Sequence, residues 1–263
     1  MEYEAAVLDL DGTVYRGEEL LPGAAEAVER LRAAGLGTLF FSNNPTKSRV
    51  AYAERLSGLG IETTPEETLS AGTVTTRYLR DEHADESVFV IGTPGLERQF
   101  ETAGVDLVAD ATTAEVLVVS WTREFDYGDM VAGYRAIDAG ATFYGTDPDR
   151  LIPAAEGMAP GSGAIVNAVG GIAERAPEKT LGKPSEEAQQ AALDALGVPA
   201  ERCFVVGDRL NTDIELGERA GMTTVLVRTG VTADADLAES DVQPDYVVDS
   251  LADVPDAVGI DAT

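Results

Sequence analysis

The sequence is poor in the side chains that form disulfides and soft metal sites. Its 263 residues include one cysteine, Cys203, and one histidine, His83. A single cysteine cannot form an intrachain disulfide, and no CxxC pair or second histidine is present to complete a zinc site. Cys203 lies in the apolar run RCFVVG, which is typical of a core position, whereas His83 lies in the charged stretch RDEHADES. Clusters of cysteine and histidine ligands are therefore excluded.

Long apolar runs are also absent. No stretch reaches the ~18 consecutive apolar residues of a membrane-spanning helix. The opening residues, MEYEAAV, lack the basic segment followed by an apolar segment that marks a secretory signal peptide. The sequence therefore predicts a cytoplasmic protein.

Positive charge is scarce. There are 19 basic residues against 47 acidic ones, for a net charge of -28, and Lys47, Lys179 and Lys183 are the only lysines. Such a field repels nucleic acid and anionic membranes, so we expect neither as a partner. The composition resembles that of cytoplasmic proteins from salt-accumulating halophiles, and we hypothesise that folding needs high salt. An ordinary acidic protein is the alternative.

Apolar runs of strand length alternate with segments of helical period, which predicts an α/β fold with a Rossmann-like parallel sheet. Strands are expected at 4–10, 35–42, 87–92, 115–121, 141–146, 202–208 and 223–227. Helices are expected at 23–35, at 46–60 with Thr46 as N-cap, at 64–82, 95–104, 127–140 and 214–221. Residues 245–258 resume the same alternation.

The stretch DLDGT places two carboxylates where the first strand ends. Residues Asp9 and Asp11 start out on the same side of the strand, and Gly12 permits a sharp departure of the chain. Ligands of open α/β sheets bind beyond the carboxyl ends of the strands. Two acids there repel each other unless a cation lies between them, and Mg²⁺ is the hard ion that takes oxygen ligands. The sequence therefore predicts a magnesium site at this edge.

Other polar residues stand at further strand or loop ends. They are Ser42, Asn43 and Asn44 in FFSNN, Lys183 in LGKPSEEA, and Asp208 and Asp213 in FVVGDRLNTD. Lys183 precedes Pro184, which can begin a helix, so its ammonium is expected near a helix N-terminus where an anion binds well. Residues that merely form turns would not be expected to place acids, hydroxyl and amide groups, a lysine and further acids at successive strand or loop ends.

With these motifs the chain resembles the haloacid dehalogenase-like superfamily of phosphotransferases. DLDGT is similar to its first motif, Ser42 to its second, Lys183 to its third and GDRLNTD to its fourth. The segments SNNPTKSR and GKPSEEA resemble the NagD or 4-nitrophenylphosphatase-like branch. This resemblance extends from about residue 5 to residue 255. That branch usually has Asp where Asn211 stands, which affects only details of the metal site.

The resemblance implies an Mg²⁺-dependent phosphatase that hydrolyses a small phosphate monoester. Asp9 would form an aspartyl phosphate, and Asp11 would serve as acid and then base. Mg²⁺ would be held by Asp9, Asp208 and the backbone carbonyl of Asp11, with Asp213 as a further or outer ligand. The phosphoryl oxygens would be bound by Ser42, Lys183, Asn43, Asn44 and the backbone amides near Leu10.

The resemblance also implies three segments. Residues 1–80 and 179–263 would form the core domain, and residues 81–178 an inserted α/β cap of type 2 that covers the active site. The candidate substrate loops are YGTDPDRLIP, residues 144–153, and APGSGA, residues 159–164. For Asp147 and Ser162 within them, a turn or capping role is the favoured interpretation.

Four alternatives stay open at this level. A phosphotransferase or mutase could use the same scaffold, whereas a dehalogenase needs neither Asp11 nor a metal. A signalling receiver module also surrounds a phosphorylated Asp with acids, a hydroxyl and a lysine, but it is about half as long. A catalytically silent phosphate-binding protein is the fourth. The substrate (phosphoglycolate, glycerol phosphate, a sugar phosphate or a nucleotide) and a homo-oligomeric state are left open.

Overall fold

The computed structural model describes residues 3–154 and 157–260. The chain divides into two compact units. The first comprises the chain up to Ser42, Arg49–Leu69 and the chain from Ala188 onward, and the second comprises Asn43–Ser48 and Ser70–Glu187. No helix in the described part is both long and apolar enough to cross a membrane.

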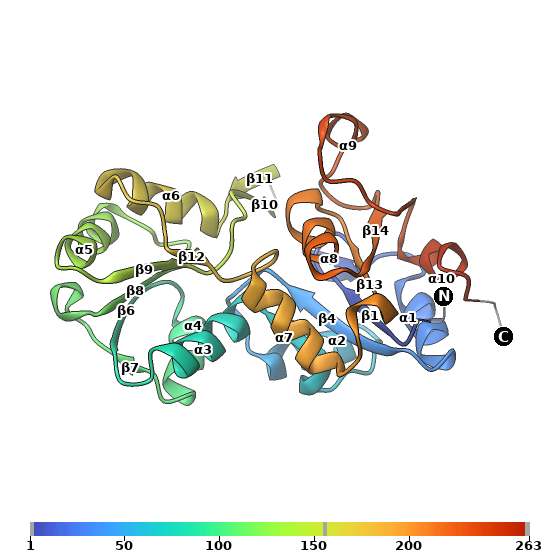
Figure 1. The fold of residues 1–263 in the computed structure, drawn as a ribbon, viewed down its shortest axis with the longest axis horizontal. Helices are drawn as coiled ribbons and strands as arrows, with labels where there is room; N and C mark the ends of the chain where they lie inside the picture. The colour runs from blue at the N-terminus through green and yellow to red at the C-terminus, as the bar shows by residue number, and fades with distance from the viewer. Residues whose placement is uncertain (1–2, 155–156, 261–263) are drawn as a thin grey trace. The chain divides into compact units, whose positions relative to one another are not determined.

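The first unit is built on a six-stranded sheet with the order β15-β14-β13-β1-β4-β5 (Figure 1). Neighbouring strands from β15 through β4 run parallel. The strands are β1 (Ala5–Leu8), β4 (Gly37–Ser42), β5 (Thr68–Ser70), β13 (Cys203–Gly207), β14 (Thr223–Val227) and β15 (Tyr246–Val248). The parallel sheet confirms the expected α/β class.

Helices bury both faces of this sheet. On one face, Leu8 of β1 joins an apolar cluster with Leu31 of α1 (Ala24–Ala33) and Tyr52 of α2 (Arg49–Gly58). On the other, α8 (Glu215–Ala220) packs so closely that a Cβ on Gly217 would lie 2.3 Å from Val205 Cγ1. Because both faces are covered, β1 and β13 are buried along their whole length and read as continuous apolar runs.

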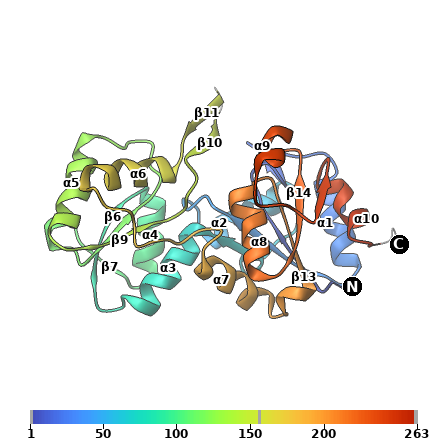
Figure 2. The ribbon, with the colours of Figure 1, turned by 45° about the horizontal axis from the view of Figure 1, so that its top comes forward.

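The second unit has its own five-stranded parallel sheet, with the order β12-β9-β8-β6-β7. Its strands are β6 (Ser87–Ile91), β7 (Asp106–Leu107), β8 (Val116–Val119), β9 (Thr142–Gly145) and β12 (Lys179–Thr180). Helices α3 (Ala71–Glu82) and α4 (Pro94–Thr102) cover one face, and α5 (Tyr127–Asp138) and α6 (Ser162–Ala173) the other (Figures 1 and 2). The apolar cluster on the α5 and α6 side includes Ile137, Phe143 and Val169.

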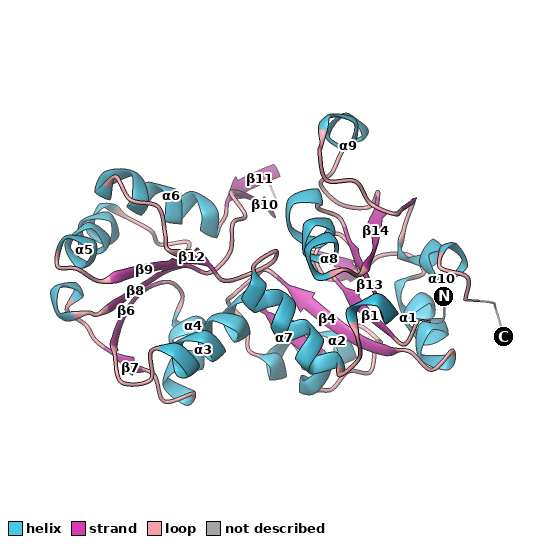
Figure 3. Cartoon of the chain, viewed as in Figure 1, coloured by secondary structure: helices cyan, strands magenta, loops and turns pink. Residues whose placement is uncertain are grey.

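Shorter elements complete the alternation of helix and strand that Figure 3 shows. Two antiparallel strand pairs are present in the described part, β2–β3 (Tyr15–Arg16 and Glu19–Leu20) and β10–β11 (Leu151–Ala154 and Gly157–Pro160). The remaining elements are α7 (Glu186–Leu196), α9 (Asp234–Glu239), α10 (Val254–Ala257), η1 (Pro65–Glu67), η2 (Ala111–Thr113), η3 (Ala200–Arg202), η4 (Leu210–Ile214) and η5 (Leu251–Asp253).

Two expected elements differ from the structure. Residues 64–82 are not one helical segment: the 3₁₀ turn η1 leads into strand β5, and α3 begins only at Ala71 with Ser70 as its N-cap. Thr46 is not the N-cap of α2, which begins at Arg49. The amide and hydroxyl of Thr46 instead donate hydrogen bonds to Asn44 Oδ1, at 3.0 and 2.7 Å, in an Asx turn.

The division into units also differs in position from the segments 1–80, 81–178 and 179–263. Helix α3 packs against α4 and belongs with the second unit from Ser70 onward, and the second unit extends to Glu187. The short segment Asn43–Ser48 is grouped with it too.

Candidate active site

Asp9 and Asp208 come together because β1 and β13 are adjacent and end at the same level. Leu8 pairs with Val206, and the amide of Asp9 donates to the carbonyl of Val206 at 2.9 Å. Each carboxylate therefore follows the last residues of its strand, at the carboxyl edge of the sheet. The residues Asp9 and Asp208 are 7% and 2% exposed.

Asp213 reaches the same place from the turn that follows β13. Leu210 and Ile214 anchor this turn in an apolar cluster with Leu226 of β14. The amide of Arg209 donates to Asp213 Oδ2 at 3.1 Å, which fixes the carboxylate at the start of the turn. Asn211, the departure from the family pattern, is exposed and lies outside the acidic group.

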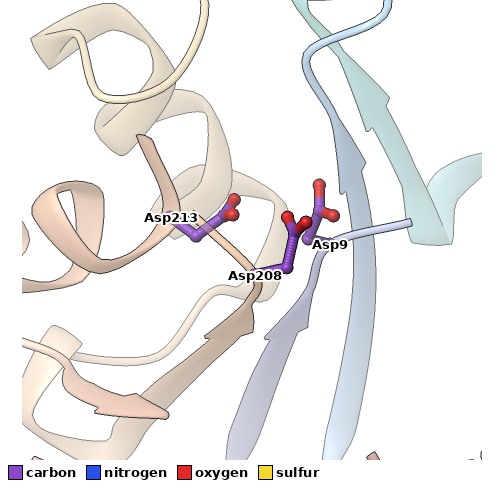
Figure 4. A group of neighbouring side chains, drawn as sticks. All are labelled: Asp9, Asp208 and Asp213. Carbon is purple, nitrogen blue, oxygen red and sulfur yellow. The ribbon is translucent and has the colours of Figure 1, made fainter. Parts of the chain in front are cut away.

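The carboxylates of Asp9, Asp208 and Asp213 form one buried group, with one oxygen of each lying within 4.8 Å of the others. Figure 4 shows Asp9 and Asp208 side by side, with the carboxylate of Asp213 directed toward Asp208. Two like charges about 4 Å apart repel by roughly 4 kcal/mol at an effective dielectric near 20. Oxygen donors at this spacing fit a hard divalent cation such as Mg²⁺.

Glycines make room for these carboxylates. A Cβ on Gly230 would lie 1.8 Å from Asp208 Oδ2, and one on Gly207 would lie 2.2 Å from Asp213 Cγ. Gly12 has a φ of +95°, and its Cβ would lie 2.6 Å from Asp208 Oδ2. The backbone approaches the acids so closely that a larger residue at these positions would displace them.

Asp11 lies outside the acidic group. Its side chain is exposed, and its backbone makes an isolated bridge with Tyr15. The loop is tied down because the carbonyl of buried Leu10 accepts from the amides of Thr13, Val14 and Tyr15. An exposed carboxylate at the edge of a buried site can exchange protons with a bound molecule.

Two buried tyrosines, Tyr15 and Tyr52, lie near Asp9 and Asp11 and were not among the candidate residues of the sequence. Burial raises the pKa of the Tyr52 phenol above its ordinary value, and its hydroxyl is hydrogen-bonded to Ser42. Burial likewise raises the pKa of Tyr15, and the charge of Asp11 adds to that shift. Arg55 stacks on the Tyr15 ring at 4.4 Å. Within apolar helical and strand patterns, these tyrosines read as ordinary core residues.

The structure brings Asn43 and Lys183 together in the second unit. Asn43 Oδ1 accepts from the amide of Lys183 at 2.8 Å, and Asn43 Nδ2 donates to the carbonyl of Lys183 at 3.1 Å. Both residues are buried. Asn44 is exposed, and its side chain holds the Asx turn with Thr46.

The two candidate substrate loops also meet in the second unit. The amide of Gly161 donates to the carbonyl of Arg150 at 3.0 Å, and the amide of Gly163 to that of Asp149 at 2.9 Å. Burial raises the pKa of Asp147 to about 8, and the charge of Asp149 adds to the shift, opposed by hydrogen bonds such as that with Ser162.

Comparison with known proteins agrees with this arrangement. The family model described as haloacid dehalogenase-like hydrolase matches residues 6–106, and a second model, described as HAD-hydrolase-like, matches residues 180–254. The chain belongs to the haloacid dehalogenase-like hydrolase family. The expected family is therefore confirmed.

Particular relatives match over nearly the whole chain. The sugar-phosphatase AraL of Bacillus subtilis is 35% identical, over 94% of this chain and 90% of the relative. The structure of the p-nitrophenyl phosphatase from Archaeoglobus fulgidus superposes with a TM-score of 0.91 at 36% identity, covering 98% of this chain and 100% of that chain. The glycerol phosphate phosphatase from Mycobacterium tuberculosis, solved in complex with magnesium, has a TM-score of 0.87 at 28% identity, covering 95% and 75%.

Proposed function

We propose that this protein is a phosphoric monoester hydrolase that acts on a small phosphorylated metabolite. The observation that carries the proposal is the group of three buried carboxylates at the carboxyl edge of a parallel sheet, in a member of this hydrolase family. Relatives named as sugar, p-nitrophenyl and glycerol phosphate phosphatases support the same reaction class.

The acidic group is suited to hold Mg²⁺. Asp9, Asp208 and Asp213 would supply oxygen ligands, and the backbone carbonyl of Asp11 is a further candidate. When bound, the ion would offset the repulsion between these carboxylates and a phosphate dianion. The magnesium complex of the glycerol phosphate phosphatase is consistent with this choice of ion.

Asp9 is the proposed nucleophile. One of its oxygens would attack phosphorus in line, forming the acyl phosphate bond while the ester P–O bond breaks. Thr13 Oγ1 donates to Asp9 Oδ2 at 3.4 Å, which helps to orient the carboxylate. Water would then attack phosphorus and release the Asp9 carboxylate together with inorganic phosphate.

Asp11 is the proposed proton carrier. In its protonated form it would donate to the oxygen of the leaving alcohol, and as a carboxylate it would then accept a proton from the attacking water. Its exposed position allows both exchanges. One residue thus serves both half-reactions.

Ser42, Lys183 and the backbone amides near Leu10 are proposed to bind the phosphoryl oxygens. The Ser42 hydroxyl is a neutral donor held by Tyr52, and the Lys183 ammonium would supply positive charge. In a chain with a net charge of -28, such a cation is needed to attract an anionic ester.

The test is phosphate release from a panel of esters at molar KCl with Mg²⁺. The panel should include 4-nitrophenyl phosphate, glycerol phosphate, phosphoglycolate, sugar phosphates and nucleotides. Release from one or more of these esters supports the proposal. A folded protein that releases no phosphate from any of them would leave a binding role in its place.

A further inference from the structure

The side chain of Asn43 is engaged with the backbone of Lys183, although the two residues lie 140 positions apart. Its carbonyl oxygen accepts from the Lys183 amide at 2.8 Å, and its NH₂ group donates to the Lys183 carbonyl at 3.1 Å. Asn43 is 7% exposed and Lys183 is 1% exposed. The carboxamide thus reproduces the paired donor and acceptor of a β-ladder neighbour.

The chain just before Lys183 is fixed as well. The amide of Leu181 donates to the carbonyl of Gly145 at 2.9 Å, and the amide of Gly182 donates to the carbonyl of Thr146 at 2.7 Å. These bonds continue the pairing of β12 with β9. The backbone at Lys183 is therefore fixed by two sets of hydrogen bonds, those of residues 181–182 with the end of β9 and those of Lys183 with the Asn43 side chain.

Gly182 shows how tightly this junction is packed. A Cβ at position 182 would lie 2.7 Å from the Thr146 carbonyl oxygen and 2.8 Å from Asn43 Oδ1. Real Cβ atoms do not approach so closely, so a side chain here would push the Asn43 carboxamide or the Thr146 carbonyl aside. The contact between Asn43 and Lys183 thus depends on glycine at 182.

Holding this backbone has a consequence for the ammonium. A lysine places its charge at the end of a flexible four-carbon stem, and a well-oriented group lowers the entropic part of a reaction barrier. Fixing the Cα of Lys183 restricts the positions that the ammonium can reach. The two carboxamide bonds of Asn43 are directed at the two peptide groups that flank the Lys183 Cα, which is the geometry of a positioning residue.

We propose that Asn43 is a positioning residue for Lys183, and that its contribution to phosphate binding passes through Lys183 and not through its own contact with the phosphoryl group. This inference rests on the proposed phosphatase function. It assigns Asn43 a different role from that of a direct phosphate ligand.

A double-mutant cycle tests the coupling. The variants are Asn43→Ala, Lys183→Ala and the double variant, and the readouts are kcat and KM for 4-nitrophenyl phosphate and the inhibition constant of inorganic phosphate. We expect Asn43→Ala to lower kcat/KM about 10-fold and Lys183→Ala to lower it further. The double variant should equal Lys183→Ala within about 2-fold, because residues that act as a unit are not additive. A double variant whose loss of kcat/KM equals the product of the two single losses would overturn the proposal.

A second readout does not depend on activity. Exchange of the Lys183 amide proton, measured by hydrogen–deuterium exchange, should be at least about 10-fold faster in Asn43→Ala, since the bond to Oδ1 is lost. Asn43→Asp keeps an oxygen for that amide and should retain most of the protection. Unchanged exchange of the Lys183 amide in Asn43→Ala would contradict the positioning role of Asn43. Absence of turnover in the unaltered protein would contradict only the proposed phosphatase function.

The matched control is Asn167→Ala, since Asn167 is an exposed asparagine on α6 of the same unit. It should leave both the kinetics and the Lys183 exchange unchanged. If Asn43→Ala does not fold, Asn43→Asp is carried through the same cycle, because it loses the donor to the Lys183 carbonyl while keeping the size of the side chain. Multiplying losses in that cycle would again contradict the proposal.

Discussion

At the scale of single residues, neighbouring polar groups lie in different environments and are proposed to have different roles. Asp9 is buried beside Asp208, whereas Asp11, two residues on, is exposed. Asn43 holds the backbone of Lys183, whereas Asn44 caps a turn. The environment, more than the residue type, separates the role of each.

Asp9→Asn removes the charge of the proposed nucleophile and keeps its shape. We expect kcat for 4-nitrophenyl phosphate to fall at least ~10³-fold, because an amide cannot form the acyl phosphate. Steady-state kinetics measure the loss, and a thermal melt within a few degrees of the unaltered protein shows that the fold is intact. Near-normal turnover in this variant would contradict the proposed covalent aspartyl-phosphate intermediate.

Tyr52→Phe removes the hydroxyl that is bonded to Ser42 and leaves the ring in the core. We expect kcat/KM to fall about 3- to 10-fold, which matches the net worth of about one hydrogen bond. The same substitution in a Ser42→Ala background should have little further effect. Equal losses in both backgrounds would show that Tyr52 acts independently of Ser42.

The sequence points to the acids and the lysine as candidates because each stands at the end of an apolar run or beside a turn signal, and the structure groups three of the acids, Asp9, Asp208 and Asp213. The partners of these groups could not be found in this way. Tyr15 and Tyr52 look like core residues, and the bonds between Asn43 and Lys183 join positions whose pairing depends on the three-dimensional fold. Contacts between distant residues carry no local pattern.

At the scale of elements, long strands and helices were predicted well, and short ones were not. Strands β1, β4 and β13 lie within their expected ranges because both faces are buried and the runs are continuously apolar. Strand β5, with three residues, was hidden between the turn at Pro65 and helix α3. Strand β11 likewise lies in a stretch rich in Gly and Pro that indicates only turns.

The loop after β9 gives a pH-dependent prediction. The folded-state pKa of Asp147 is raised to about 8, mainly by burial, so the folded state binds this proton more tightly than the unfolded state does. Its contribution to stability is therefore complete below about pH 4, where the unfolded carboxyl titrates, and it is lost as the pH rises toward 8. The slope for one proton is at most about 1.4 kcal/mol per pH unit.

Urea unfolding between pH 5 and pH 9 checks this prediction. Asp147→Asn should lose stability less steeply with rising pH than the unaltered protein. The control is Asp138→Asn, since Asp138 is exposed on α5. Parallel curves for Asp147→Asn and the unaltered protein would show that Asp147 does not titrate in this range.

At the scale of the whole molecule, the borders of the two units depend on packing between elements that are distant in the sequence. The alternation of elements predicts a second α/β series, whereas the grouping of α3 and of Asn43–Ser48 with the second unit carries no local sequence signal. Strand order and the meeting of β1 with β13 are also properties of the assembled sheet.

The net charge of -28 leads to a prediction about salt. The screening length falls from about 10 Å at 0.1 M salt to about 3 Å at 1 M, so mutual repulsion of the acidic side chains weakens. We expect the free energy of unfolding in urea to increase between 0.1 M and 2 M KCl. Sucrose of equal osmolality serves as an uncharged control. Equal stability at the two KCl concentrations would contradict the halophilic interpretation.

The central claim is that the carboxylates of Asp9, Asp208 and Asp213 act through a shared divalent cation. The most direct measurement is the rate of 4-nitrophenyl phosphate hydrolysis after removal of metal with EDTA, and again as Mg²⁺ is returned. We expect turnover to fall at least ~100-fold without metal and to recover with Mg²⁺, and we expect Asp208→Asn to need much more Mg²⁺ for any recovery. Full turnover in EDTA, with no response to Mg²⁺, would contradict it.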